Sequence, residues 1–362
     1  MKVLILSADL GGNVPPALAI ADALARRGVE VEIAGLVPGS TELEHVPFLP
    51  GEAAGPQGQQ GLRKTASMYR LFASKRVSAE TETLMDARRP DVVLVDCMLI
   101  APLRGALRTG FPVVVMFHTL GEFWSRIDRT VGRVLGLLGF RPHALWAKAD
   151  ERLMLTDADL DRADAGDFPD SIWTGTTEVG VEPSPRRARP RILVALSTTD
   201  WPGMLPVYRR IVTALSGLSV DAVVTTGGVD LGGPLAGAAN VDVRGWAGHA
   251  ELLPSMDLVI GHGGHSTTMK VLAHGVPLLV LPINPTSDQR LVGDAVERSG
   301  VGRVLPKSTR VSGLRSAVES MLGDGDLRER AATNGRRLRA APAGAEAAAE
   351  RIIAVGDARL RP

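Results

Sequence analysis

The chain has 362 residues, which is enough for two domains of about 150 to 200 residues each. Its 41 basic and 40 acidic side chains nearly balance, so the composition does not predict a nucleic-acid or strongly anionic partner. No apolar run reaches the ~18 residues of a membrane-spanning helix and the N-terminus lacks a signal-peptide cleavage site, so we expect a soluble protein with no transmembrane segment.

The chain opens with the alternation that is typical of a parallel α/β domain. A strand is expected at residues 3–7, a helix with apolar residues at helical spacing follows a glycine turn, and a second strand is expected at 29–34. Pro16 suits the first turn of this helix, and Gly28 marks its end. The turn lacks a GxGxxG fingerprint and therefore does not indicate a dinucleotide cofactor.

Two further strands of the same sheet end in side chains that can carry chemistry. The runs 91–96 and 112–117 are nearly continuous in Val and Leu, as expected for strands that are covered on both faces. Asp96 ends the first strand and His118 follows the second, so both should face the ligand crevice at the carboxyl edge of the sheet. Cys97, the only cysteine, is expected to be a small buried residue and suits a reducing cytoplasm.

The first domain is expected to close with a helix at 125–138 and a short strand at 152–155. A stretch rich in Pro, Arg and Ser then indicates a linker, and a second α/β domain begins after it. Ser197 and Thr198 follow the first strand of that domain, where they can bond a phosphate. The predicted divisions are an N-terminal domain at 1–183, a linker at 184–190, a C-terminal domain at 191–342, and a final helical segment at 343–362 able to pack back on the first domain.

The most informative stretch is VIGHGGHSTTMKVLAHGVPLLVLPINPTSDQ, at residues 259–289. Its pattern indicates a strand, a tight turn and a helix, followed by a second strand at 277–281. Gly263 and Gly264 let the backbone approach a ligand, while Ser266 and Thr267 open the helix with free N–H groups and hydroxyls. A helix N-terminus of this kind predicts a phosphate site, to which the flanking His262 can add a donor.

Three more side chains suit a sugar nucleotide. Asp288 and Gln289 offer acceptors and a mixed donor and acceptor to sugar hydroxyls. Trp246 follows a strand and a glycine, and its ring can stack on a nucleobase; a core or interface position is the alternative. The seven histidines form no HExxH, and the glycines beside His262 and His265 favour a phosphate loop, so we expect no metal.

Together these residues resemble the donor-sugar signature of the family one glycosyltransferases, which are inverting enzymes that use nucleotide sugars. The matching positions are His262-Gly263-Gly264, Ser266-Thr267, Gly275-Val276-Pro277 and Asp288-Gln289. The resemblance implies an α/β fold of two facing Rossmann-like domains, the GT-B fold, with a cleft between them. It also implies that His262 and the helix N-terminus hold the diphosphate, with no cofactor besides a TDP- or UDP-sugar as co-substrate. In the same way it implies that Asp288 and Gln289 hold the sugar and that Trp246 stacks on the base.

The N-terminal turn is similar to the acceptor-side turn of this superfamily and to the opening of the MurG-type transferases. Its residues are Gly11, Gly12, Asn13, Val14 and Pro16. The resembled families carry the general base, His or Asp, at position 13, but the neutral amide of Asn13 cannot accept a proton at neutral pH. Asp96 can replace the base directly or through water, His118 can replace it with an ordinary pKa near ~6.5, or the acceptor arrives as an anion. The fourth option is that the acceptor-side site carries out no proton transfer.

Residues 42–76 lose regular periodicity, apart from a short helix expected at 64–74. Long irregular segments in a compact domain are often functional. The equivalent loops line the acceptor pocket in the resembled family, which implies acceptor contacts for Met68, Tyr69 and Phe72. The alternative is that these three side chains are core residues of the short helix.

The leading hypothesis is an inverting glycosyltransferase that moves a sugar from a TDP- or UDP-sugar to a small hydrophobic natural product, such as an antibiotic aglycone or glycoside. A MurG-like transferase that acts on a lipid-linked cell-wall precursor is the first alternative. A noncatalytic auxiliary protein that binds a nucleotide sugar is the second, because Asn13 stands at the usual base position. A cytoplasmic location is expected, and the oligomeric state stays open, a homodimer included.

Overall fold

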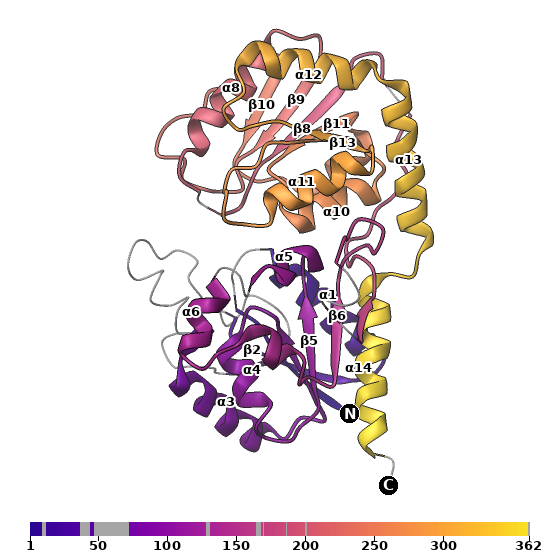
Figure 1. Cartoon of the computed structure of the whole chain (residues 1–362). Coiled ribbons are helices and arrows are strands. Elements are labelled where there is room, and N and C mark those ends of the chain that lie inside the picture. Colours follow the sequence, from indigo (N-terminus) through magenta and orange to yellow (C-terminus); the bar gives the residue numbers. More distant parts are fainter. Residues whose placement is uncertain are drawn as a thin grey trace. The chain divides into compact units, whose positions relative to one another are not determined.

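The computed structural model describes residues 1–8, 12–36, 44–46, 72–127, 131–163, 168, 170–185, 187–199 and 201–360. The chain forms two compact units, each built around its own parallel sheet (Figure 1). Unit 1 comprises Met1–Thr177 and Pro342–Pro362, and unit 2 comprises Glu178–Ala341. Both units are α/β, which confirms the predicted fold class of two Rossmann-like domains.

Unit 1 contains a seven-stranded sheet in the order β3-β2-β1-β4-β5-β6-β7. Its strands are β1 (Lys2–Leu6), β2 (Glu30–Ala34), β3 (Glu44–Val46), β4 (Val92–Asp96), β5 (Val113–Phe117), β6 (Glu151–Met154) and β7 (Ser171–Trp173). Its helices are α1 (Val14–Arg26), α3 (Lys75–Arg88), α4 (Ile100–Ala106), α5 (Gly121–Ser125), α6 (Val131–Leu137), α7 (Pro142–Trp146) and α14 (Gly344–Leu360). Strands β4 and β5 are buried along their whole length, as their continuous apolar sequences predict.

The C-terminal helix α14 belongs to unit 1, where it packs against α1. Ala348, Ala349 and Ile352 are buried in the same cluster as Val3 and Ile5 of β1. At the rim of this contact, Arg26 at the end of α1 and its C-cap residue Arg27 pair with Glu346. Apolar burial therefore holds the end of the chain on the domain in which it starts, and exposed ion pairs add little to it.

The helix expected at 125–138 is confirmed only over α6, Val131–Leu137, because Ser125 is the last residue of a separate helix, α5. Helix α5 starts at Gly121, where the carboxylate of Asp161 accepts from the N–H groups of Gly121 and Glu122 at 2.7 and 3.1 Å. It ends at Ser125, whose hydroxyl donates to the Glu122 carbonyl. The residue that accepts the first N–H groups of this helix lies 40 residues away. The helical spacing of apolar residues therefore cannot predict where the helix begins.

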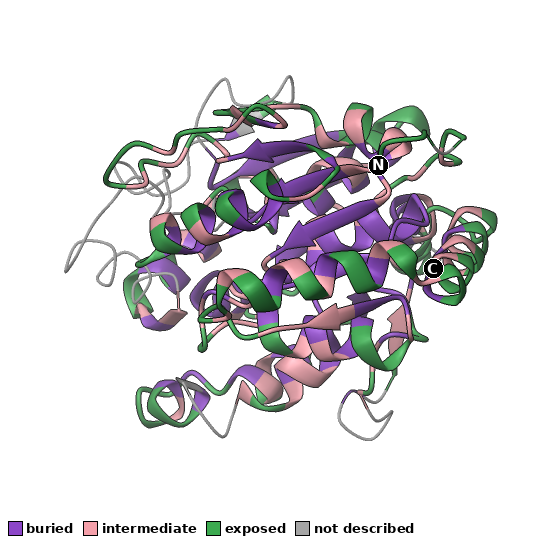
Figure 2. Cartoon of the chain, turned by 90° about the horizontal axis from the view of Figure 1, so that it is seen from above, coloured by how far each residue is buried: buried purple, intermediate pink, exposed green. Residues whose placement is uncertain are grey.

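Unit 2 contains a six-stranded sheet in the order β10-β9-β8-β11-β12-β13. Its strands are β8 (Arg191–Ala195), β9 (Asp221–Thr225), β10 (Val241–Arg244), β11 (Leu258–Gly261), β12 (Leu278–Val280) and β13 (Gly302–Val304). Its helices are α8 (Met204–Ser216), α9 (His249–Leu252), η2 (Leu253–Ser255), α10 (His265–Ala273), α11 (Gln289–Arg298), α12 (Val311–Gly323) and α13 (Gly325–Ala340). Buried residues lie on the strands and on the inner faces of the helices (Figure 2).

Residues 178–185 fold with unit 2, ahead of the stretch 184–190 that was expected to be the linker. Gly180 lies so close to the carbonyl of Ala273 that a Cβ atom would collide with it. The N–H of Ser184 donates to the carbonyl of Pro254 at 2.6 Å. Within the described part of the chain, no helix combines the length and the apolar character needed to span a bilayer.

Candidate functional site

The topology of unit 2 gathers the expected donor-binding residues at one edge of its sheet. The chain runs outward from β8 through β9 to β10 and then returns to place β11 on the other side of β8, with Ala195 opposite Gly261. This reversal is a topological switch point, where parallel sheets bind ligands beyond the carboxyl ends of their strands. Ser197 follows β8 and His262 follows β11, so both lie at this position.

The turn after β11 requires both of its glycines. Gly263 has φ +88°, and a Cβ there would collide with the carbonyl oxygen of Gln289. A Cβ on Gly264 would stand 2.6 Å from two atoms of the His262 ring. The ring of His262 therefore lies directly against the Gly264 backbone, at the entrance to α10.

Helix α10 begins immediately after this turn, with Gly264 as its N-cap residue and therefore without a side-chain cap. His265, Ser266 and Thr267 form its first turn. The N–H groups at a helix start carry partial positive charge and attract anions. A helix start of this kind at a switch point is suited to a phosphate.

His262 is held in its neutral form beside this helix start. Burial lowers the pKa of His262 to about 4, so the ring carries no charge at neutral pH. Its Nδ1 atom is buried and has no hydrogen-bond partner among the described residues. A buried ring nitrogen without a partner costs free energy, and a ligand atom that bonds the imidazole would recover part of it.

Ser197, Thr198 and Trp246 differ in exposure. The hydroxyl of Ser197 accepts the Thr199 N–H at 2.9 Å, and Thr198 is exposed. The side chain of Trp246 is 72% exposed after the end of β10, which excludes the core position that the sequence left open. An exposed ring at the ligand edge is available for stacking.

Asp288 and Gln289 are placed differently from each other. Asp288 is the N-cap residue of α11 and is partly buried. Gln289 is 2% exposed, and its Oε1 atom accepts the N–H groups of Ile283 and Asn284 at 2.8 and 2.9 Å. The amide oxygen of Gln289 therefore shapes the loop after β12, which leaves the carboxylate of Asp288 as the more accessible acceptor of the pair.

Glu178 and Lys270 join this region although the sequence analysis did not single them out. The hydroxyl of Ser266 donates to Oε1 of Glu178, and Nζ of Lys270 lies 3.2 Å from Oε2 of the same carboxylate. Ser266 and Lys270 are four residues apart and so share a helix face, but nothing in the sequence links Glu178 to them. Only the tertiary structure reveals this contact.

The expected acceptor-side residues gather at the corresponding switch point of unit 1. Strand β4 returns beside β1, with Leu6 opposite Val95. Asn13 is 1% exposed, and its Nδ2 group donates to Oδ2 of Asp96 and to the carbonyl of Ala8, both at 2.7 Å. Asn13 thus makes the hydrogen bond to Asp96 that a base at position 13 would make, without being able to take a proton.

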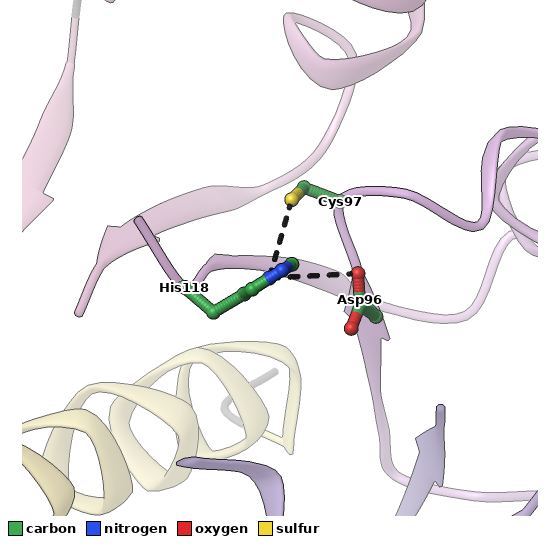
Figure 3. Close-up of side chains that lie close together, drawn as sticks. All are labelled: Asp96, Cys97 and His118. Atoms are coloured by element: carbon green, nitrogen blue, oxygen red, sulfur yellow. Dashed lines mark hydrogen bonds and ion pairs between the residues drawn. The ribbon is translucent and has the colours of Figure 1, made fainter. Parts of the chain in front are cut away.

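Asp96 and His118 meet at the ends of neighbouring strands. Asp96 is fully buried, and its Oδ1 accepts the Met98 N–H at 2.8 Å. Nδ1 of His118 lies 3.8 Å from Oδ1 of Asp96 and 3.8 Å from Sγ of Cys97 (Figure 3). The His118 side chain is 12% exposed, so of these three groups it is the one open to solvent.

Asp96, Cys97 and His118 bring three metal-ligand atom types within 4.8 Å of one another. Burial, together with the charge of Asp96, raises the pKa of the Cys97 thiol, which favours the protonated form over the thiolate that metals bind. Both oxygens of Asp96 already accept protein N–H groups. Within the described residues, the carboxylate of Asp96 is thus already engaged by protein donors and the thiol of Cys97 is held protonated.

The expected acceptor contacts are only partly described. Met68 and Tyr69 lie outside the described residues. Phe72 is partly buried and packs against the core of unit 1. This packing is what the core-residue alternative predicts for Phe72.

Comparison with known proteins identifies the second half of the chain. Residues 215–355 match the family described as erythromycin biosynthesis protein CIII-like, C-terminal domain. The NDP-glycosyltransferase YjiC of Bacillus subtilis (strain 168) is 31% identical over 166 residues, which cover 45% of this chain and 41% of that protein. The matched stretch thus spans less than half the length of this curated relative.

Solved structures match the whole fold. The glycotransferase of kitacinnamycin has a TM-score of 0.79 and 21% identity, and the alignment covers 98% of each chain. The glycosyltransferase VinC in complex with DTDP has a TM-score of 0.72 and 20% identity, with 99% of this chain and 100% of that chain covered. The fold is therefore that of the GT-B glycosyltransferases.

The family match and the sequence relative each cover less than half of the chain. In its second half the chain is similar to glycosyltransferases of the natural-product type. These likenesses agree with the family that the sequence pattern resembles.

Proposed function

We propose that this chain is an inverting glycosyltransferase that moves a sugar from a TDP- or UDP-sugar to a small hydrophobic natural product. The observation that carries the proposal is the glycine turn of unit 2, which places the His262 ring at the start of α10, at a switch point of the sheet. The relative named as an NDP-glycosyltransferase and the structure solved with DTDP support a nucleotide-sugar donor. The erythromycin-type family match supports an antibiotic-like acceptor.

In this proposal unit 2 holds the donor. The N-terminus of α10 and the neutral His262 bind the diphosphate, and no metal ion is required to offset its charge. Trp246 stacks on the base, and Asp288 accepts from sugar hydroxyls. Ser197 and Thr198 also bind the phosphates of the donor. Thr267 lies in the first turn of α10.

Unit 1 activates the acceptor, and His118 is the general base. Asp96 is too enclosed to reach an acceptor itself, but its carboxylate faces Nδ1 of His118 and can stabilise the imidazolium that forms. Nε2 of His118 takes the hydroxyl proton as the acceptor oxygen forms a bond to the anomeric carbon. The bond from that carbon to the diphosphate breaks on the opposite face, and the leaving diphosphate keeps the electron pair.

A noncatalytic auxiliary protein is the second candidate, and Asn13 is the observation that favours it. Its amide satisfies Asp96 without offering a base, which is the arrangement expected if proton transfer were lost. In the structure nothing specifically favours a MurG-like role over the natural-product role.

Turnover and binding assays separate these functions. Calorimetry should detect TDP or UDP binding, and chromatography should detect a glycoside when a TDP- or UDP-sugar is mixed with phenolic or alcohol acceptors. Binding without product across both acceptor classes would favour the auxiliary protein. Absence of nucleoside diphosphate binding would refute the donor site and both of these functions.

A further inference from the structure

Glu178 occupies part of the helix start that the proposed donor would use. Its side chain is 10% exposed, and its two carboxylate oxygens bind Ser266 and Lys270 on one face of α10. Ser266 is the second residue of the helix, and Lys270 lies about one turn further on. The carboxylate therefore binds side chains on the first turns of α10, the end of the helix that favours anions.

Both chain segments that join unit 2 to unit 1 are attached to this same helix. Glu178 is the first residue of unit 2, and Gly180 packs against the carbonyl of Ala273 at the other end of α10. Arg339 precedes the second crossing at Ala341 and donates to that carbonyl at 2.7 Å. Whatever loosens Glu178 from α10 therefore loosens one of the two segments through which the chain leaves unit 2.

The Ser266 hydroxyl has a single proton to donate. While it donates to Glu178, it cannot donate to a phosphate oxygen, and the carboxylate repels a diphosphate placed at the same helix start. Lys270 is neutralised by the same carboxylate. A ligand that displaces Glu178 would gain both a hydroxyl donor and a cation.

We propose that Glu178 is an internal anion that competes with the donor diphosphate for Ser266 and Lys270. Binding of the diphosphate releases Glu178 from the first turns of α10 and so loosens the segment 178–180. This inference rests on the proposed donor site, and it adds a residue that sets the affinity of that site. It also makes the first crossing segment responsive to the donor.

The test compares TDP binding to the full-length parent, Glu178→Gln and Glu319→Gln by calorimetry. Glu178→Gln keeps the shape and an oxygen for Ser266 but removes the charge, so TDP should bind about fivefold more tightly. Glu319 is exposed on α12 and gives the same change in net charge, so Glu319→Gln should leave the affinity unchanged. If Glu178→Gln does not fold, Glu178→Asp provides a shorter side chain that reaches Ser266 less well and should also tighten binding.

Hydrogen exchange measured by mass spectrometry gives a second, independent readout. In the parent protein, TDP should raise exchange in the segment 178–180 while lowering it in the first turn of α10. Unchanged or weaker TDP binding by Glu178→Gln, or added protection of 178–180, would overturn this inference and leave the donor site intact. A parent protein that binds neither TDP nor UDP would overturn the proposed function itself, and this inference with it.

Discussion

The two sheets have the same topology at the carboxyl ends of their strands, but the groups found there differ: mainly backbone in unit 2 and side chains in unit 1. In each unit the chain returns to place a later strand beside the first one, β4 beside β1 and β11 beside β8. At the edge of unit 2 the site consists mainly of backbone, with two glycines and an open helix start. At the edge of unit 1 it consists of buried side chains that bind one another.

This difference predicts that the two sites tolerate substitution differently. A site made of backbone leaves little room for added side chains: a Cβ on Gly263 would collide with the backbone of Gln289, and a Cβ on Gly264 would displace the His262 ring. A site made of side chains can pass a role to a neighbour: Asn13 keeps the hydrogen bond to Asp96, while His118 approaches the other oxygen of the same carboxylate. Among related chains, the residues of the proposed donor site in unit 2 should therefore vary less than those of the proposed acceptor site in unit 1.

The largest effect is expected from His118→Ala, which tests whether the base has moved to His118. Turnover should fall by about 10²- to 10⁴-fold because no other partly exposed group near Asp96 in the described structure can take the proton. TDP affinity, measured by calorimetry, should stay the same because the donor residues lie in unit 2. Unchanged turnover in a folded variant would instead indicate an acceptor that arrives as an anion.

Asn13→Asp tests the interpretation of Asn13 as a hydrogen-bond donor. The change replaces an N–H group that donates to Asp96 and Ala8 with a second carboxylate, so two buried acceptors would face each other. The free energy of unfolding at pH 7 should fall by about 3 kcal/mol. Relative to the parent protein at the same pH, the loss should shrink in acid, where a proton shared by the two carboxylates restores a donor. A loss that does not depend on pH would contradict this.

The stability of unit 2 should fall in mild acid. Burial lowers the pKa of His262 to about 4, burial and then Lys270 lower that of His249, and burial lowers that of His274. Histidines in the unfolded chain have a pKa near ~6.5, so they take up protons at a higher pH than these histidines do in the folded protein. The stability that the neutral histidines contribute is therefore complete above pH ~6.5 and is lost as the pH falls towards 4. We expect His262 to contribute about 2 kcal/mol to this loss, given its partial exposure. Urea unfolding of the parent and of His262→Gln at pH 7 and pH 5 would measure it, and equal pH dependence in the two proteins would exclude His262 as the source.

Gly264→Ala tests the backbone nature of the donor edge. Its Cβ would stand 2.6 Å from the His262 ring, so the ring must move and TDP affinity should fall about tenfold, or 1.4 kcal/mol. The matched control is Gly323→Ala at the exposed end of α12, where a Cβ would meet no atom within 4 Å. Equal TDP affinity in both variants would show that the His262 ring takes no part in donor binding.

The smallest effect is expected from Trp246→Ala. Because the side chain is 72% exposed, thermal stability should not change. Loss of stacking should weaken nucleoside diphosphate binding about fivefold, whereas Trp246→Phe should retain most of the affinity. If the affinity for inorganic pyrophosphate falls as much as the affinity for TDP does, Trp246 does not stack on the nucleobase.

Much of the donor edge could be predicted from the sequence because its signals are local. Apolar runs marked the strands β8, β9 and β11, and a glycine pair before Ser266 marked the turn into α10. The role of Gln289 could not be predicted, because its amide oxygen binds a loop that folds back on it. The start of α5 at Gly121 could not be predicted, because the carboxylate that accepts its N–H belongs to Asp161, 40 residues away.

By itself the sequence determined that the chain has two parallel α/β domains and a glycine turn at Gly263 and Gly264. Periodicity and glycine are sufficient for this, because they act on backbone conformation within a few residues. Only the tertiary structure decided that Asn13 donates to Asp96, 83 residues away, and that Glu178 meets Ser266, 88 residues away. These contacts depend on which strands and segments become neighbours, and this is settled by packing of the whole domain.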